Sequence, residues 1–389
     1  MYLLLLLYPV VLKIGYDSVF IYPQEIIFYL FIMFLLITGS YSRKFIPVIL
    51  LIFGLHLFLM VHFAITKDNT SIAYIKQFAI FYILLIPQKY FSKVNVFIIF
   101  KVWLVVGIFN LLYIVGNYLV LKPSALEYLF NYHPMYRIIG FTGSGIDLKS
   151  FEIRSSFTLN EIGTTTISLS ILYAFIALVF IFSSLKHPHR KSVAALLLCG
   201  ATFSRSGLAA YFISICVYFI RQRVSVSYFY KITPYFVALI TLLSLSMIGL
   251  ISVSKFDFSA IENFITVLLR LKYWGYALEF FANNVSALAF GVNALGYNIF
   301  DVIRIDYAES LFLDLLINYG VFPVIIVLLI FYQIFFKKRK FYSDLADWQA
   351  LLPVFGVGLF MANVMAGSSF LTDFLMPIIL SIIIKYERS

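Results

Sequence analysis

Residues 45–63 read FIPVILLIFGLHLFLMVHF and contain no Asp, Glu, Lys or Arg. As an α-helix this run would rise about 28 Å, close to the roughly 30 Å hydrocarbon core of a bilayer. Similar runs recur along the 389 residues, so that 62% of the chain is hydrophobic and 12% charged. Soluble proteins carry about 45–50% apolar and about 25% charged residues. The sequence therefore predicts an all-α, polytopic membrane bundle. It excludes a soluble enzyme, a disordered chain and an outer-membrane barrel, which would need alternating apolar and polar residues.

The apolar runs predict about twelve transmembrane helices in one membrane domain covering residues 1–389. The first run is short and has neither the basic start nor the small-residue cleavage site of a signal peptide. The expected spans are 1–12, 25–39, 45–63, 71–86, 94–119, 158–183, 192–203, 207–220, 232–252, 311–336, 350–364 and 368–384.

The net charge of +11 is distributed unevenly between the linkers. One set of linkers holds 16 Lys and Arg and 3 acids, whereas the alternate set holds 10 Lys and Arg and 15 acids. The positive-inside rule places the first set, and both termini, in the cytoplasm. Two long loops, 120–157 and 253–310, then lie outside, where we expect short amphipathic helices. This distribution predicts a protein that works on the outer side and has no nucleic-acid partner.

Arg205 interrupts the apolar stretch 193–220 within the sequence ATFSRSG at 201–207. We expect two short or tilted segments that meet at Arg205. An arginine at membrane depth must face a partner or a wet cavity, and its planar guanidinium suits phosphate. The alternative is that Arg205 ends a span at the outer headgroups.

In the second outer loop, Arg270, Tyr273, Trp274 and Ala277 are spaced i, i+3, i+4 and i+7. They share one face of a predicted amphipathic helix, which we expect to lie along the membrane surface. An arginine beside Tyr and Trp suits a phosphate and a sugar ring. The alternative is a surface helix with ordinary aromatic anchors.

Carboxylates and further polar residues flank the spans in both outer loops. Glu309 precedes the run 311–336, where it is either a general base or an acid stabilised by the helix dipole. Asp306 lies just before it, and Arg154, Asn160 and Glu161 lead into the run 158–183. The scattered histidines have no metal-ligand spacing, and the two cysteines imply neither a disulfide nor a metal site.

Several of these segments, taken in order, form a recognisable pattern over residues 150–335. Together they resemble the O-antigen polymerase family, within the O-antigen polymerase and ligase superfamily. The segments are Arg154 with Asn160; Ser204-Arg205-Ser206-Gly207; Arg270 with Tyr273, Trp274 and Ala277, leading to Gly291 and Gly296; and Glu309-Ser310 with Leu313, Leu316 and Tyr319-Gly320.

The resemblance implies a GT-C-like, metal-independent glycosyltransferase of the bacterial inner membrane, without a cofactor. Its donor and acceptor would be glycans on undecaprenyl pyrophosphate, and a chain-length regulator protein would be a candidate partner. Arg205 and Arg270, with Arg154 as a third member, would stabilise the pyrophosphate. Glu309 would be the first candidate for the base, and Glu161 and Asp306 would be the next candidates. Asn160, Tyr273 and Trp274 would contact sugar.

Alternative functions make different demands on the sequence. The ligase branch typically has a histidine late in the second outer loop, but the chain has none after His189. A lipid-linked oligosaccharide flippase predicts cationic residues in both halves of the bundle, yet the first five spans contain only Lys76 and Lys101. A small-solute transporter predicts matched broken helices in two repeats, and no repeat is visible. These comparisons favour the polymerase.

Overall fold

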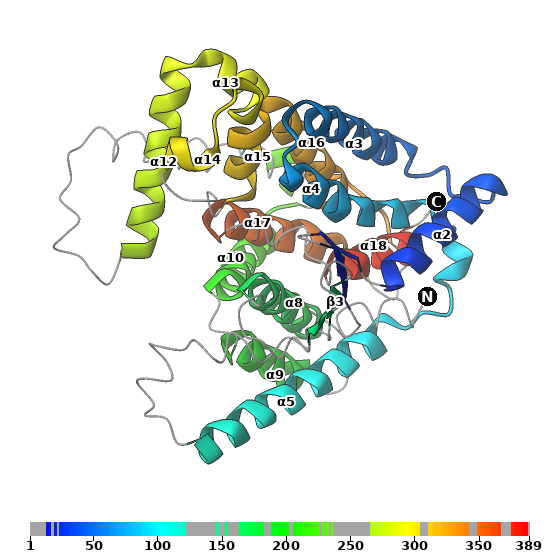
Figure 1. Cartoon of the computed structure of the whole chain (residues 1–389). Coiled ribbons are helices and arrows are strands. Elements are labelled where there is room, and N and C mark those ends of the chain that lie inside the picture. Colours follow the sequence, from blue (N-terminus) through cyan, green and yellow to red (C-terminus); the bar gives the residue numbers. More distant parts are fainter. Residues whose placement is uncertain are drawn as a thin grey trace.

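The computed structural model describes residues 13–16, 19–21, 23–121, 145–147, 152–154, 163–182, 188–201, 205–225, 228–229, 231–232, 235, 265–303, 310–341, 348–366 and 375–387. The described part is mostly helical, which confirms the all-α prediction for the bulk of the chain (Figure 1). The helices are α2 Pro23–Ile37, α3 Ile46–Thr66, α4 Asn69–Ala79, α5 Val96–Leu121, α8 Gly163–Ile181, α9 Pro188–Ala201, α10 Arg205–Gln222, α12 Ile265–Asn283, α13 Val285–Phe290, α14 Ile299–Ile303, α15 Leu311–Tyr319, α16 Val321–Phe331, α17 Trp348–Ala366 and α18 Leu375–Tyr386.

A small sheet departs from the expected helical loops. Its four strands are β1 Lys13–Tyr16, β2 Val19–Ile21, β3 Gly145–Asp147 and β4 Glu152–Arg154, in the order β2-β1-β3-β4. β1 pairs with β3 in parallel, and the other two pairings are antiparallel. Two segments that the charge pattern assigns to the same side of a membrane are therefore neighbours. The described residues of the loop 120–157 beyond Leu121 form strands, where amphipathic helices were expected.

Within the described residues, a single helix, α3, is both long enough and apolar enough to cross a membrane. The predicted number of about twelve spans is therefore not confirmed. Shorter apolar helices cover Ile26–Ile37, Thr70–Leu85, Val96–Phe109, Ser170–Ile181, Ser206–Gln222, Val321–Phe336, Gln349–Ala362 and Leu375–Tyr386.

Two of the predicted apolar runs are interrupted within the described residues. The run 311–336 divides at Gly320, whose φ of +81° and ψ of −170° end α15 and precede α16. The run 71–86 changes at Ile80 from α-helix to a 3₁₀ segment, Ile80–Leu85. In the run 193–220, α9 ends at Ala201 and α10 begins at Arg205, and the three residues between them lie outside the described residues.

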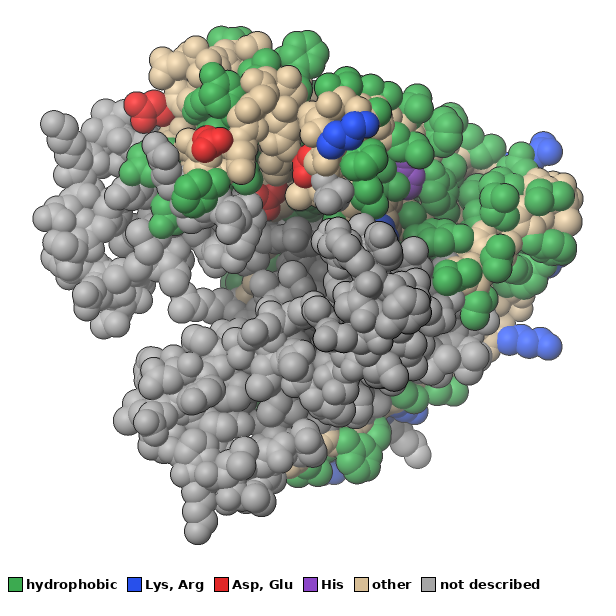
Figure 2. Space-filling model, viewed as in Figure 1, with side chains coloured by type: hydrophobic (Ala, Val, Ile, Leu, Met, Phe, Trp, Pro, Cys, Tyr) green, Lys and Arg blue, Asp and Glu red, His purple; other side chains and the backbone are tan. Residues whose placement is uncertain are grey.

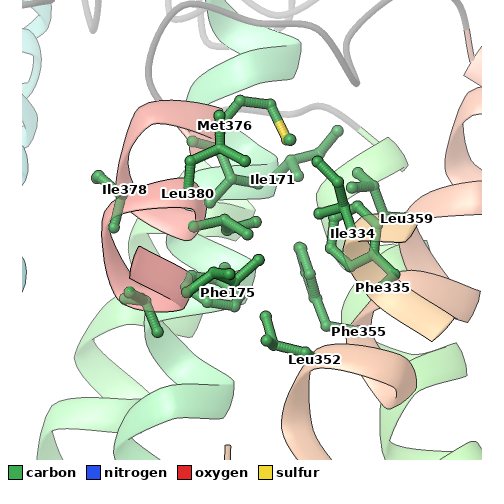
Figure 3. Close-up of a cluster of buried hydrophobic side chains, with 14 of the residues drawn as sticks. Ile171, Phe175, Ile334, Phe335, Leu352, Phe355, Leu359, Met376, Ile378 and Leu380 are labelled. Atoms are coloured by element: carbon green, nitrogen blue, oxygen red, sulfur yellow. The ribbon is translucent and has the colours of Figure 1, made fainter. Parts of the chain in front are cut away.

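The main hydrophobic core joins α8, α10, α17 and α18 with the end of α16 (Figure 3). Ile171 and Phe175 of α8 lie beside Met376 and Leu380 of α18, opposite side chains of α17 and of the π-helical turn Tyr332–Phe336 (Figure 3). The rings of Phe175 and Phe355 approach to a centroid distance of 4.8 Å. Almost every residue of α18 is buried, so its hydrophobic character on all sides reflects a central position.

Close packing between α10 and α17 depends on Gly358. A Cβ on Gly358 would lie 2.3 Å from Ala210 O and 2.4 Å from Ser214 Oγ. We expect Gly358→Ala to lower the free energy of unfolding by about 1–3 kcal/mol, because the two backbones would have to separate. Thermal unfolding in detergent measures the loss. The matched control is Gly54→Ala on α3, where a Cβ meets nothing within 4 Å and stability should rise by about 0.5–1 kcal/mol. Equal shifts for both variants would contradict the packing argument.

The C-terminal end of the bundle is tied together by charged side chains. Glu387 forms ion pairs with Arg339 at 3.1 Å and with Lys44 at 3.8 Å. Arg339 also donates to the carbonyl oxygens of Gln333 and Ile334 at the end of the π-helical turn. Burial lowers the pKa of Lys44 from its ordinary value, and the Glu387 carboxylate opposes that shift. These contacts join segments that the charge pattern places in the cytoplasm.

A second, smaller hydrophobic cluster belongs to the α12–α15 region. It comprises Trp274, Ala277, Phe281, Ala287, Val292, Val302, Ile303, Leu313 and Ile317. α12 runs across the direction of the bundle helices rather than along them (Figure 1). We call α12, α13 and α14 the outer layer. It has a core of its own and meets the bundle through α15 and α16.

Candidate functional site

A group of polar side chains lies where the outer layer meets the corner between α3 and α4. α3 ends at Thr66, and Lys67, with φ of 58°, donates its N–H to Phe63 O at 2.8 Å. Asp68 then caps α4 by accepting from Thr70 N at 3.0 Å. An aspartate after an apolar helix is suited to this role because its carboxylate satisfies an otherwise unpaired N–H of the new helix.

The Asp68 carboxylate also links segments that are more than 200 positions apart in the sequence. Asn293 Nδ2 donates to Asp68 Oδ2 at 2.9 Å, and Tyr319 OH lies 3.5 Å from the same oxygen. The Thr70 hydroxyl bonds to Asp68 Oδ2 and lies 2.7 Å from Tyr319 OH. We call Asp68, Thr70, Asn293, Asn318 and Tyr319 the Asp68 cluster. Asn318 joins it through its Oδ1, 3.4 Å from Asn293 Nδ2.

Aromatic rings support this cluster from the bundle side. The His62 ring lies 4.7 Å from the Tyr319 ring at an interplanar angle of 71°, and Tyr74 lies 5.7 Å away at 89°. Both are edge-to-face geometries, which aromatic pairs favour. His62 Nδ1 is 3.4 Å from Ser71 Oγ, which in turn donates to Tyr319 OH at 3.4 Å. Because Tyr319 and Ser71 are fully buried, their polar atoms need these partners.

Two glycines, Gly291 and Gly320, allow the ends of α13 and α15 to come into contact. A Cβ on Gly291 would lie 2.2 Å from Asn318 O, and a Cβ on Gly320 would lie 2.2 Å from Ala289 O. Val292 N also donates to Ile317 O at 2.7 Å. We call this contact the glycine joint. It holds Asn293 and Tyr319 where both can reach Asp68.

The chemistry of the cluster suits recognition of hydroxyl groups. Asp68 Oδ2 already accepts several donors, whereas Asp68 Oδ1 accepts from Thr70 N alone among the bonds within the described part. Asp68 and Asn293 are both half-buried, so they are accessible from the surface. A carboxylate oxygen with a remaining lone pair, held in place by its neighbours, can accept a bond from an incoming hydroxyl.

Coupling between Asp68 and Asn293 can be measured. Asp68→Ala should lower the free energy of unfolding by about 1–2 kcal/mol, because α4 loses its cap. Asn293→Ala should lower it by about 1 kcal/mol through the lost hydrogen bond. In a double-mutant cycle the combined loss should be smaller than the sum by at least about 0.5 kcal/mol. As a control, Asp68→Ala should add fully to Asn283→Ala, since Asn283 donates instead to Glu279 O. Simple additivity in the first pair would show that the bond contributes nothing.

Four of the residues proposed from the sequence lie outside the described residues. These are Asn160, Glu161, Asp306 and Glu309. Their roles in catalysis or sugar binding stay predictions, although Ser310, which follows Glu309, is buried at the start of α15.

The three proposed arginines are located by their backbone alone. Arg205 is the first residue of α10, Arg270 lies in α12 and Arg154 ends β4. Their proposed role on a pyrophosphate stays a prediction.

The predicted amphipathic helix is present as α12, but its aromatic face has a different environment from the one expected. Trp274 is 3% exposed and belongs to the hydrophobic cluster of the outer layer, together with Ala277. Its ring therefore packs against protein and offers no open face to a sugar or a membrane in this structure. Tyr273 is half-buried at the edge of the same cluster and stays a candidate.

The Asp68 cluster was not identified from the sequence as a site. One available signal was Asp68-Asn69-Thr70 directly after an apolar run, which is typical of a helix start. The other was Asp314 and Asn318 within the apolar run 311–336, since polar residues in such runs are commonly functional. Asp314 is 7% exposed and Asn318 is 8% exposed.

Neither a metal centre in the described part of the chain nor a known relative identifies the chemistry of the site. Within the described residues, no three His, Cys, Asp or Glu side chains lie close enough together to hold a metal ion. No protein-family model matches the chain, and no curated protein or solved structure matches it significantly.

Proposed function

We propose that this chain is a polytopic glycosyltransferase of the bacterial inner membrane, of the O-antigen polymerase type. It would join oligosaccharide repeat units carried on undecaprenyl pyrophosphate into a surface polysaccharide, on the periplasmic side. Both termini would be cytoplasmic, and about twelve segments would cross the bilayer.

Apolar side chains on the surface of the bundle support the membrane location. Figure 2 shows hydrophobic side chains over much of the surface formed by α2 and α3. Exposed large apolar residues recur along three helices, where a water-facing surface would carry charge. They are Ile27, Leu30, Met33, Phe34 and Ile37 on α2; Leu50, Phe53, Leu57, Met60, Val61 and Ile65 on α3; and Val321, Phe322, Ile325, Leu328 and Leu329 on α16. We call this surface the apolar belt.

The glycine joint is the observation on which the proposed activity depends most. Gly291 and Tyr319-Gly320 belong to separate segments of the pattern that resembles O-antigen polymerases. In the structure their backbones are in contact, and Asn293 and Tyr319, close to the two glycines in the chain, both reach Asp68. The resemblance was drawn from the sequence without knowledge of this contact. Two segments of the resembling pattern thus lie together, beside side chains that suit the binding of sugar hydroxyls.

The proposed reaction is a single displacement at the anomeric carbon of the donor. The acceptor hydroxyl oxygen forms a bond to that carbon, while the bond from carbon to the pyrophosphate oxygen breaks. Undecaprenyl pyrophosphate leaves with the electron pair, and the hydroxyl proton passes to a base, for which Glu309 is the candidate. Attack from the opposite face inverts the anomeric centre. Arg205, Arg270 and Arg154 would stabilise the charge that develops on the leaving group.

The decisive experiment is polymerisation of a lipid-linked repeat unit by the purified protein in detergent, with EDTA present throughout. A ladder of longer lipid-linked glycans would support a metal-independent polymerase. Transfer of the glycan to a lipid A core acceptor, without a ladder, would instead indicate the ligase.

A flippase is tested by a parallel measurement in proteoliposomes. If the protein forms no ladder but moves lipid-linked substrate across the bilayer, the polymerase proposal is wrong and the transporter takes its place.

A further inference from the structure

α13 and the turn that follows it have an unusual surface for an outer layer. Within the six-residue α13 the only buried side chain is Ala287. Large apolar side chains are exposed both on the helix and beyond it: Val285 71%, Leu288 39%, Phe290 62%, Leu295 39%, Tyr297 45% and Phe300 47%. Residues 280–300 contain no Asp, Glu, Lys or Arg. A water-facing segment of this length would normally carry several charges.

This surface continues the apolar belt of the bundle. Gly320 packs on the backbone of Ala289, and a Cβ there would lie 2.8 Å from Phe290 N. Val321, the next residue after Gly320, begins the exposed apolar face of α16 and is 41% exposed. Phe322 then meets Phe58 of α3 at a ring-centroid distance of 5.1 Å. Apolar side chains therefore extend from α3 over α16 to α13.

The position of α13 in the fold agrees with this continuity. α13 lies at the edge of the described part of the molecule, next to α15 and α16 (Figure 1). The aromatic face of α12 at Trp274 and Ala277 is occupied by the core of the outer layer.

We propose that α13 and the following turn, Val285–Phe300, insert into the outer interface of the lipid bilayer and anchor the outer layer to it. The partner is the boundary between headgroups and acyl chains, where the apolar faces of such helices lie about 5–10 Å deep. The inference rests on the membrane location within the proposed function and does not depend on the sugar chemistry.

The test is depth-dependent fluorescence quenching in proteoliposomes of phosphatidylethanolamine and phosphatidylglycerol. The background carries Cys199→Ala and Cys216→Ser, and an environment-sensitive dye is attached to Phe290→Cys or, as a second site, Val285→Cys. Leu57→Cys on the exposed face of α3 is the reference for the bilayer. Glu279→Cys, exposed on α12, is the reference for water. Quenchers are lipids brominated at shallow or deep acyl positions, and iodide in the water phase.

We expect the dyes at 290 and 285 to be quenched by shallow brominated lipids and shielded from iodide. The dye at 57 should respond to the deep bromines, and the dye at 279 to iodide alone. Quenching of 290 and 285 by iodide, with 57 still in lipid, would overturn the anchor while leaving the membrane proposal intact. Iodide quenching at 57 would overturn both. Shielding of 290 and 285 from every quencher would mean that protein covers α13, which also contradicts a lipid anchor.

Discussion

Replacing Gly320 with alanine is expected to lower the free energy of unfolding by about 3–5 kcal/mol. Its φ of +81° and ψ of −170° lie in a region that is accessible almost only to glycine. Independently, the new Cβ would lie 2.2 Å from Ala289 O, a backbone atom that cannot move without shifting α13. Gly291→Ala should behave alike, since its φ is 82°, its ψ is 163° and its Cβ would meet Asn318 O.

Gly296 distinguishes the two causes of the lost stability, which are backbone strain at positive φ and the clash of a new Cβ. Its φ is also +80°, but its ψ of 11° is left-handed helical and a Cβ there meets nothing within 4 Å. Gly296→Ala should therefore cost about 1–2 kcal/mol, from backbone strain alone. The measurement is thermal or denaturant unfolding in detergent of the three variants side by side. If Gly320→Ala were no less stable than Gly296→Ala, the close approach of α13 and α15 would be wrong.

Removing the Arg270 guanidinium is expected to reduce polymerisation by about 10²–10³-fold. This is the usual effect of losing one preorganised group that stabilises developing negative charge. Arg205→Lys should also reduce the rate, although by less, because lysine keeps the charge but loses the planar fork that binds phosphate through two bonds. The measurement is the initial rate of ladder formation at saturating lipid-linked substrate, with folding checked by thermal unfolding.

Two further variants are measured in the same rate assay: a control arginine on the proposed cytoplasmic side, and the candidate base Glu309. Arg190 is exposed on α9, in a linker assigned to the cytoplasm, so Arg190→Ala should leave the rate unchanged. Glu309→Gln should lower it by about 10²–10⁴-fold if the carboxylate takes the acceptor proton. If Glu309→Gln polymerised at the full rate, Glu309 would not be the base and would be only an acid stabilised at the start of a helix. Equal losses in Arg190→Ala and Arg270→Ala would remove the basis for a specific pyrophosphate site.

Local sequence predicted the existence of most helices in the described residues. The run at 45–63 corresponds to α3, the run at 94–119 to α5 and the run at 350–364 to α17, each with ends that differ by a few residues. Apolar residues that cannot face water have to pair their backbone groups internally, and a helix does so within one segment.

The break at Gly320 and the burial of Trp274 could not be read from local sequence. Glycine within an apolar run is compatible with a continuous helix. At Gly320 the helix ends because φ is +81° and ψ is −170°, and the backbone of Ala289, about 30 positions away, lies where a side chain would begin. The spacing of Tyr273 and Trp274 predicted an amphipathic face but not what would cover it. Ile303, Leu313 and Ile317 share the cluster that contains Trp274, so the face is used within the protein.

The sequence by itself determined that the chain is helical, that its apolar runs suit a membrane and that its charges divide between two sides. Those properties depend on composition and short-range pattern, which each segment carries alone. Tertiary structure decided which polar residues meet: Asp68 with Asn293 and Tyr319, across more than 200 positions. It also decided that α13 exposes apolar side chains and that Trp274 of α12 is buried. The reason is that a hydrogen bond or a buried face depends on the partner that packing supplies, and no single segment specifies that partner.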